Sequence, residues 1–154
     1  MKTTVQKSKI YLVLLIDREH ARMFTITNGI AGETVELESV DVPQNVKHGD
    51  DTWDAQDKIF RHIEDHLHRH IEKVAKEANE FAKNEKITGL LIGSHKPLFG
   101  KIEKHLKYPL SKKVIGSFVT ELKVPKNEIL KRALKLLETI SARKEVEELE
   151  KALQ

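Results

Sequence analysis

The stretch from Asp50 to His70, DDTWDAQDKIFRHIEDHLHRH, gathers many of the side chains in this sequence that are suited to chemistry. It holds clustered carboxylates, the only tryptophan, a glutamine and four of the eight histidines. Carboxylates can hold magnesium or transfer protons, and neutral imidazoles can ligate transition metals. A glutamine amide can orient water through its two N–H donors and its carbonyl acceptor. The same stretch also has the residue spacing of a helix. A structural role in that helix is therefore the alternative to each of these functions.

Three histidines, His62, His66 and His70, are spaced by four residues and therefore form one ridge of a predicted helix. Such a ridge can ligate a metal and support a metal-dependent hydrolase, but no feature of the sequence supplies a third ligand. A half-buried polar border of the helix explains the same spacing, and we favour that interpretation. A third possibility is that the ridge, with Arg61 and Arg69, faces RNA phosphates.

The carboxylates before this helix have a structural explanation as well. They are Asp50, Asp51, Asp54 and Asp57. Caps and acidic residues at a helix N-terminus complement unpaired N–H groups and the positive end of the helix dipole. We therefore predict capping rather than a magnesium site.

Asp17 ends the first predicted strand, where ribonuclease H-like nucleases place a metal-binding aspartate. A two-metal mechanism needs further carboxylates from other elements. The fourth predicted strand ends in Gly93-Ser94-His95 and supplies none. We predict that Asp17 lies in a turn or an ion pair, and that Gly93 permits a tight strand-to-helix turn.

The elements that must position these residues follow from hydrophobic periodicity. Three short strands joined by tight connections predict an antiparallel meander, and the later strands, each preceded by a helix, predict parallel pairing. The predicted strands are 9–17, 20–29, 31–42, 87–94 and 113–122, and the predicted helices are 53–84, 97–106 and a third that begins at Pro125. We expect the apolar stripe of the first helix, from Ile59 to Ala82, to face the core. The order β-β-β-α-β-α-β-α predicts an α/β fold: one mixed sheet of ribonuclease H-like topology with helices on its faces.

The composition excludes several classes of function. The 154 residues suit one domain, for which we expect bounds of 1–141, followed by a charged helical tail or linker at 142–154. The sequence has no cysteine, which excludes disulfides and thiolate metal sites and fits a cytoplasmic location. The longest apolar stretch, Ile10 to Ile16, is too short to span a bilayer. Nucleotide-binding glycine loops, the nucleophile elbow and the zincin motif are absent from the sequence. We expect no cofactor, no metal and no membrane partner.

The ordered segments carry a resemblance to a known family. A strand ending LLID and an ARMF strand come first, followed by a Trp53 segment and a helix containing FRHIEDHLHRHIEKVAKEA. The segments ITGLLIGSHKPL and VIGSFVTELKVPKNEILKRAL close the series. In this order they resemble the central domain of archaeo-eukaryotic peptide-chain release factors and of Pelota. The resemblance is closer to their bacterial and archaeal release-factor-like relatives, and it spans about Lys9 to Ile140.

The resemblance implies a function in translation. Release factors carry a Gly-Gly-Gln loop before the long helix, and the loop helps water attack the ester of peptidyl-tRNA. Related quality-control factors cleave tRNA near its 3′ end, and close relatives often have a Gly-Trp-Ser-Gln-like loop. The matching stretch here is Trp53-Asp54-Ala55-Gln56, so the resemblance implies that Gln56 is catalytic. The implied RNA-binding residues are Lys47, His48, Trp53, Arg61 and His62. The implied partner is a ribosome or tRNA.

The sequence departs from the family pattern in the reactive loop. It has no Gly-Gly there, and Pro43 to Lys58 contains four Asp against two Lys. An acidic segment is repelled by RNA phosphates. Two alternatives therefore stand beside catalysis: ribosome binding without hydrolysis, as in Pelota, or a protein-interaction or homo-oligomeric module. Trp53 has its own alternative, which is to close the edge of the core.

Overall fold

The structure is a computed structural model that describes residues 9–39 and 53–153, with side chains described from Gln56 onward in the second range. The strands are β1 (Ile10–Ile16), β2 (His20–Thr27), β3 (Ile30–Ala31), β4 (Val35–Glu38), β5 (Gly89–Ser94) and β6 (Val114–Val119). The helices are α1 (Trp53–Asn84), α2 (Lys96–His105), α3 (Lys126–Ala152) and the 3-10 turn η1 (Leu110–Lys112). Predicted and observed elements therefore agree in order and type.

The sheet runs β3-β2-β1-β5-β6, with β4 also paired to β2. β1 pairs with β2 antiparallel and with β5 parallel, and β5 pairs with β6 parallel. This is the predicted mixed sheet of ribonuclease H-like topology. The predicted third strand is interrupted: β3 and β4 are two short pieces on the edge of β2, separated by 32–34. Residues 40–42 of the predicted strand lie outside the described residues.

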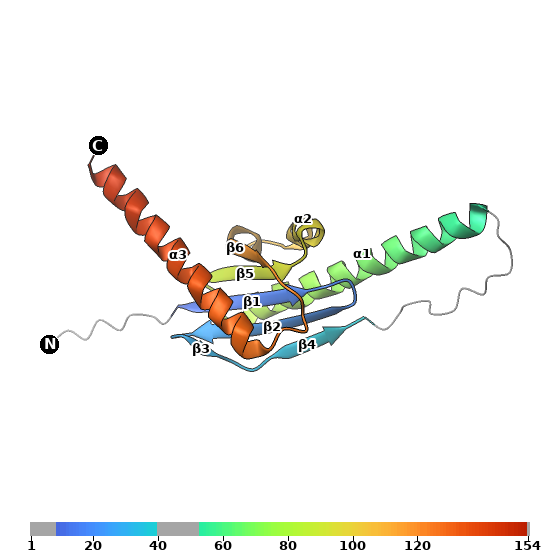
Figure 1. Cartoon of the computed structure of the whole chain (residues 1–154), viewed down its shortest axis with the longest axis horizontal. Coiled ribbons are helices and arrows are strands. Elements are labelled where there is room, and N and C mark those ends of the chain that lie inside the picture. The colour runs from blue at the N-terminus through green and yellow to red at the C-terminus, as the bar shows by residue number, and fades with distance from the viewer. Residues whose placement is uncertain (1–8, 40–52, 154) are drawn as a thin grey trace.

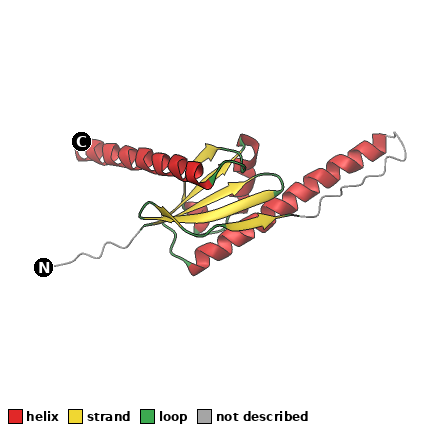
Figure 2. Ribbon diagram, turned by 60° about the horizontal axis from the view of Figure 1, so that its bottom comes forward, coloured by secondary structure: helices red, strands yellow, loops and turns green. Residues whose placement is uncertain are grey.

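β1 alternates its side chains between two apolar layers because successive strand residues point to opposite faces. Leu12, Leu14 and Ile16 pack in the layer that α1 and α2 cover. Val13 and Leu15 pack in the layer that α3 covers. Figures 1 and 2 show the resulting arrangement, with α1 and α3 on opposite faces of the sheet. β1 is therefore a central strand that is buried on both faces.

Two glycines have separate roles. Asn28 and Gly29 have φ of 54° and 78°, so both adopt the left-handed conformation of the β2–β3 hairpin turn. Gly93 is a strand residue, and the predicted role in a strand-to-helix turn is wrong. A Cβ at Gly93 would lie 2.6 Å from Leu15 Cδ2 and 3.0 Å from Phe118 Cζ. Gly93 therefore allows β5 to pack closely within the α3 layer.

The first turns of α1 extend past the end of the sheet (Figure 1). A helix of 32 residues is about 48 Å long at 1.5 Å per residue. The 7 residues of β1 span only about 23 Å. From Gln56 onward, where the side chains of α1 are described, the first buried one is His70, and the buried face continues through Ile71, Val74 and Ala78. We call residues 53–65 of α1 the overhang.

The apolar stripe of α1 was predicted to face the core along its whole length, and this prediction is wrong for the overhang. Phe60 is 66% exposed and Ile63 is 48% exposed, although both belong to the apolar pattern that continues into the buried face. The spacing of apolar residues is helical along all of α1. The sheet, however, is shorter than α1 and does not cover the first turns of the helix.

No helix among the described residues has the length and apolar character needed to cross a membrane.

Candidate functional site at the overhang of α1

Gln56 lies in the first turn of α1, and its side chain is exposed. The stretch Trp53 to Gln56 is therefore helical, whereas the resemblance implied a loop. The local sequence explains the difference, because Ala55 favours a helix and no glycine interrupts it. Gln56 is the fourth residue of α1, and the start of this helix extends beyond the sheet (Figure 1).

Gln56 shares one side of the overhang with apolar residues. At about 100° per residue, Phe60 and Ile63 lie within roughly 40° of Gln56 around the helix axis. Leu67 continues this side and is half-buried where the overhang meets the sheet. The face around Gln56 is thus a polar amide followed by an exposed aromatic ring and an exposed branched side chain.

The helix places two predicted RNA-binding residues away from this face. Arg61 and His62 are exposed, as phosphate contacts require. By the same helical geometry Arg61 lies roughly 140° from Gln56 in one direction, and His62 roughly 120° in the other. One flat surface therefore cannot meet all three side chains, and a partner that touches them must surround the overhang.

The remaining predicted RNA-binding residues cannot be placed. Lys47 and His48 lie outside the described residues. Trp53 opens α1, but its side chain is not described, so neither its predicted contact with RNA nor the alternative of closing the core is tested.

The exposure of the three histidines of the ridge decreases along the helix. His62 is exposed, His66 is half-buried and His70 is 1% exposed. Both ring nitrogens of His70 have partners: Nδ1 lies 2.5 Å from Ser39 Oγ, and Nε2 lies 3.3 Å from the His20 carbonyl oxygen. Since a carbonyl oxygen only accepts, Nε2–H is the donor and Nδ1 accepts from the serine hydroxyl. His70 therefore ties α1 to the end of β4 and to the start of β2.

Burial lowers the pKa of His70 below the ordinary value of a histidine, because desolvation disfavours the imidazolium. Hydrogen bonding to the backbone of His20 and of Asp17, and the charge of Asp17, act in the opposite direction, and His66 adds a smaller lowering effect. The neutral ring fits the hydrogen bonds, since an imidazolium would lose the acceptor nitrogen that Ser39 uses. Among the described residues, no cluster of three or more histidine and acidic side chains is arranged to hold a metal.

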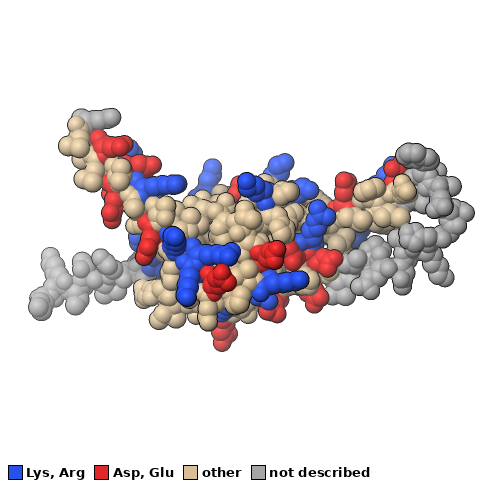
Figure 3. Space-filling model, viewed as in Figure 1, with Lys and Arg blue, Asp and Glu red and all other residues tan. Residues whose placement is uncertain are grey.

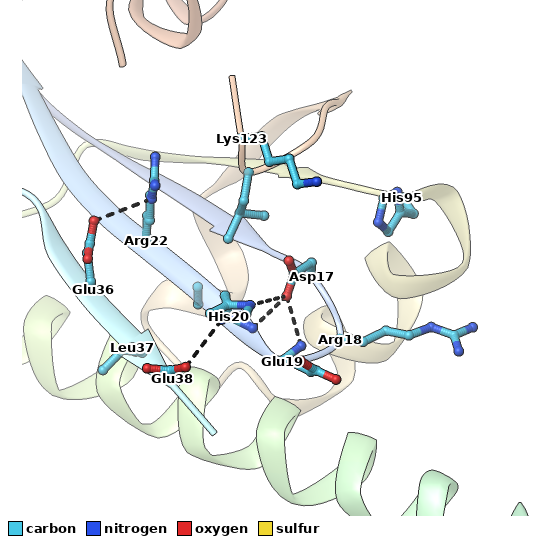
Figure 4. A pocket seen from close by; sticks show the side chains of 12 residues that line it. Asp17, Arg18, Glu19, His20, Arg22, Glu36, Leu37, Glu38, His95 and Lys123 are labelled. Carbon is cyan, nitrogen blue, oxygen red and sulfur yellow. Dashed lines mark hydrogen bonds and ion pairs between the residues drawn. The ribbon is translucent and has the colours of Figure 1, made fainter. Parts of the chain in front are cut away.

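A second polar region lies at the carboxyl ends of the parallel strands (Figure 4). It is an open hollow of about 760 Å³. Its lining residues are Asp17, Arg18, Glu19, His20, Ala21, Arg22, Glu36, Leu37, Glu38, His95, Leu122 and Lys123. This hollow was not predicted from the sequence. Asp17 and the end of the fourth predicted strand were weighed only as positions for metal-binding carboxylates.

Asp17 has the predicted turn role. Its Oδ1 accepts a hydrogen bond of 2.8 Å from the N–H of Glu19 and another from the N–H of His20. The same oxygen lies 3.6 Å from His20 Nδ1. The carboxylate thus fixes the β1–β2 turn.

Acidic and basic side chains are interspersed on the face drawn in Figure 3, and neither sign gathers into one large patch there. The net charge of the whole chain is only +3. A broad cationic surface for RNA is therefore not part of this face, and contacts with nucleic acid must come from local arrangements of residues.

Solved structures share this fold. The archaeal translation termination factor aRF1 matches with a TM-score of 0.51 and 15% identity, over 86% of this chain and 40% of that protein. Pelota from Archaeoglobus fulgidus matches with a TM-score of 0.51 and 15% identity, over 96% of this chain and 39% of that protein. The chain thus spans about two fifths of the length of either protein. At this identity the likeness concerns the fold.

The sequence has no significant match among curated proteins. A family model, in contrast, matches residues 3–138, which include every strand and helix up to the middle of α3. Its description is bacterial archaeo-eukaryotic release factor family 10. The chain therefore belongs to this family and is a translation-related, release-factor-like protein.

Proposed function

We propose that the chain acts on ribosome-bound peptidyl-tRNA or tRNA through the overhang of α1, with Gln56 orienting the water or hydroxyl that attacks the scissile bond. A neutral amide can donate to a developing oxyanion and accept from the attacking water. The observation that carries the proposal is the position of Gln56, an exposed amide at the end of a projecting helix in a release-factor-like fold.

The position of Gln56 supports access to a reacting bond. The amide is not packed against the sheet, and the side chains beside it on its face are Phe60 and Ile63 rather than charged groups. Displacement of water by such apolar groups strengthens the electrostatic effect of a nearby amide. The exposed guanidinium of Arg61, on another side of the overhang, is available for a flanking phosphate.

The test is incubation of the purified chain with stalled ribosome–peptidyl-tRNA complexes. One gel separates intact peptidyl-tRNA, free peptide and trimmed tRNA, and therefore identifies the bond that is cut. We expect product with the unmodified chain and a loss of about 100-fold or more in rate with Gln56→Ala, the size found when an oxyanion donor is removed.

Asp65→Asn is the matched control. Asp65 is exposed on the same helix and lies about 180° from Gln56 around the axis, so its substitution alters the overhang without altering the reactive face. Equal product from the unmodified chain and Gln56→Ala would remove Gln56 from the chemistry.

A second candidate function is binding without hydrolysis. The specific observation in its favour is the exposed pair Phe60 and Ile63, because apolar side chains three residues apart on a helix are suited to a hydrophobic groove of a partner. Co-sedimentation separates the candidates. Salt-sensitive ribosome binding without product indicates an RNA-contacting binder, and binding to a protein partner that is insensitive to salt indicates an interaction module.

A further inference from the structure

The end of α3 carries apolar side chains that the core does not use. Residues 142–153 form the last turns of α3 and its C-cap, which extend away from the sheet (Figure 1), and all of them are exposed. Val146 is 54% exposed, Leu149 63% and Leu153 86%, and Ala142 is exposed as well. We call these four residues the tail stripe. A single exposed apolar residue needs no explanation, but a set aligned on one helix does.

The tail stripe lies on a different side of α3 from the residues that pack on the sheet. The residues of α3 that pack in the core layer are Ile129, Leu130, Ala133, Leu134, Leu136, Leu137 and Ile140. At about 100° per residue, the centre of this set and the centre of the tail stripe lie roughly 180° apart around the helix axis. The tail stripe is therefore not the core-facing pattern continued past the sheet, as in the overhang of α1. It is a separate apolar surface.

The spacing of the tail stripe is that of a contact between two helices. Its residues follow one another at intervals of four, three and four, which is the a/d pattern of a coiled coil. They lie within about 60° around the helix axis. A helix that packs on a globular core presents a wider stripe, of roughly 100° or more. The surface that fits the tail stripe is therefore another helix.

The charges beside the tail stripe indicate which helix that is. One flank carries Arg143 and Glu150, and the other carries Glu145 and Ala152. In a two-fold antiparallel pair of these segments, each flank meets the same flank of the partner in reverse order, so Arg143 lies opposite the partner's Glu150. In a parallel pair, attraction between Arg143 and the partner's Glu138 would be offset by repulsion between like charges. The like charges are Glu145 and the partner's Glu150.

The segment is ready for such a contact before a partner arrives. It is continuous with the part of α3 that Ile129 and Ala133 anchor in the core, so association does not have to nucleate a helix. Arg143 and Glu150 form no ion pair with another described residue. Because the contact is short, we expect a weak association that depends on concentration.

We propose that the tail stripe is a self-association surface, through which two copies of the chain form an antiparallel helix pair. Ala142 packs against the partner's Leu153, and Val146 packs against the partner's Leu149. The sheets of the two copies lie at opposite ends of the pair, because the two helices run in opposite directions. The association leaves both overhangs free and does not depend on the proposed hydrolysis.

The first test is sedimentation equilibrium of the full chain from about 10 µM to about 1 mM, the range of a weak contact. We expect the average mass to rise from that of one chain toward that of two. Leu149→Gln should weaken association about tenfold or more, because it removes apolar contacts from the centre of the pair. Glu147→Gln is the matched control, since Glu147 is exposed and lies about 130° from the centre of the tail stripe. It should leave association unchanged, and circular dichroism checks that both variants keep their helices.

Charge exchange tests the direction of the pair. Glu150→Arg places like charges opposite each other in the antiparallel pair and should weaken association about threefold or more. Combining it with Arg143→Glu should restore the association. In a parallel pair, Glu150→Arg would instead strengthen association, because the new guanidinium would face Glu145, and this result would overturn the antiparallel arrangement.

Cross-linking gives an independent readout, because the sequence has no cysteine and an introduced thiol reports only its own neighbour. Under mild oxidation, a mixture of Val146→Cys and Leu149→Cys chains should form a disulfide between the two different variants, whereas Val146→Cys alone should not cross-link. The proposal is overturned if the unmodified chain stays single at every concentration, which would leave the tail stripe to a different partner. It is also overturned if Leu149→Gln associates as tightly as the unmodified chain, or if Val146→Cys cross-links only to itself.

Discussion

His70 shows how much one buried polar side chain organises in this fold. It joins the helix to two strands through Ser39 and the carbonyl of His20, while the buried Nε2 of its neighbour His66 has no hydrogen-bond partner among the described residues. A single imidazole thus satisfies two polar groups, one just after β4 and one in β2, and its neutral form is the one that fits.

The stability of the chain should therefore depend on the protonation of His70. Its folded-state pKa is below the unfolded value of 6.5, so the unfolded chain binds the proton first as pH falls. The contribution is complete above pH 6.5 and is lost below it, by at most about 1.4 kcal/mol per pH unit. Urea unfolding at about pH 7.5 and about pH 5.5 measures it.

His70→Gln provides the comparison, because an amide retains donors and an acceptor but does not titrate. We expect its free energy of unfolding to change less between the two pH values than that of the unmodified chain. The other seven histidines are common to both proteins and cancel in the difference. An equal change in the two proteins would show that protonation of His70 is not linked to folding.

At the scale of elements, α1 is one regular helix with two environments. The overhang extends past the sheet, and the apolar face from His70 onward forms part of the core. The apolar spacing does not distinguish the two parts, so substitutions at equivalent positions of the pattern should have different consequences.

Phe60→Ala should change the free energy of unfolding by less than about 0.5 kcal/mol, as expected for an exposed site. Ile71→Ala, on the buried part of the same helix, should cost about 2–4 kcal/mol, because it opens a cavity in the core. Denaturant unfolding of both variants measures the contrast. A large loss with Phe60→Ala would mean that the aromatic ring is packed in solution and is not available to a partner.

The sequence predicts these elements well and their relative lengths poorly. The continuous apolar run of β1 and the order of the later strands and helices were enough to predict the mixed sheet, because a short apolar run bounded by polar residues is typical of a strand buried on both faces. The exposure of Phe60 could not be predicted, since it depends on where the neighbouring strands end. The hollow escaped prediction for a similar reason, because its lining residues come from separate connections that reach one edge of the sheet only in the folded chain.

At the scale of the whole molecule, two helices extend beyond the sheet in different directions (Figure 1). The overhang of α1 leaves at the carboxyl ends of the parallel strands, and α3 leaves at the opposite end. The predicted tail at 142–154 continues α3 as helix as far as Ala152 without a break, and residues 141–153 are exposed throughout. The boundary predicted after residue 141 stays a prediction, because the structure does not divide the chain there.

Removal of residues 142–154 tests that boundary. The buried contacts of α3 are made by Ile129 and Ala133, supported by half-buried residues up to Ile140, so the truncated chain should retain its fold and its melting temperature within a few degrees. Thermal unfolding followed by circular dichroism measures the change. A marked fall in melting temperature would show that the tail belongs to the folded unit.

The overhang has a consequence for what the molecule can enter. Its 13 residues form a rod about 20 Å long and about 10–12 Å wide, much narrower than the body formed by the sheet and its helices. A tunnel or crevice that admits the rod and excludes the body would stop the chain where Leu67 meets the sheet. In such an encounter, the depth of penetration is set by the length of the helix, and the overhang would be shielded from a protease or a chemical label while the hollow stayed open to solvent.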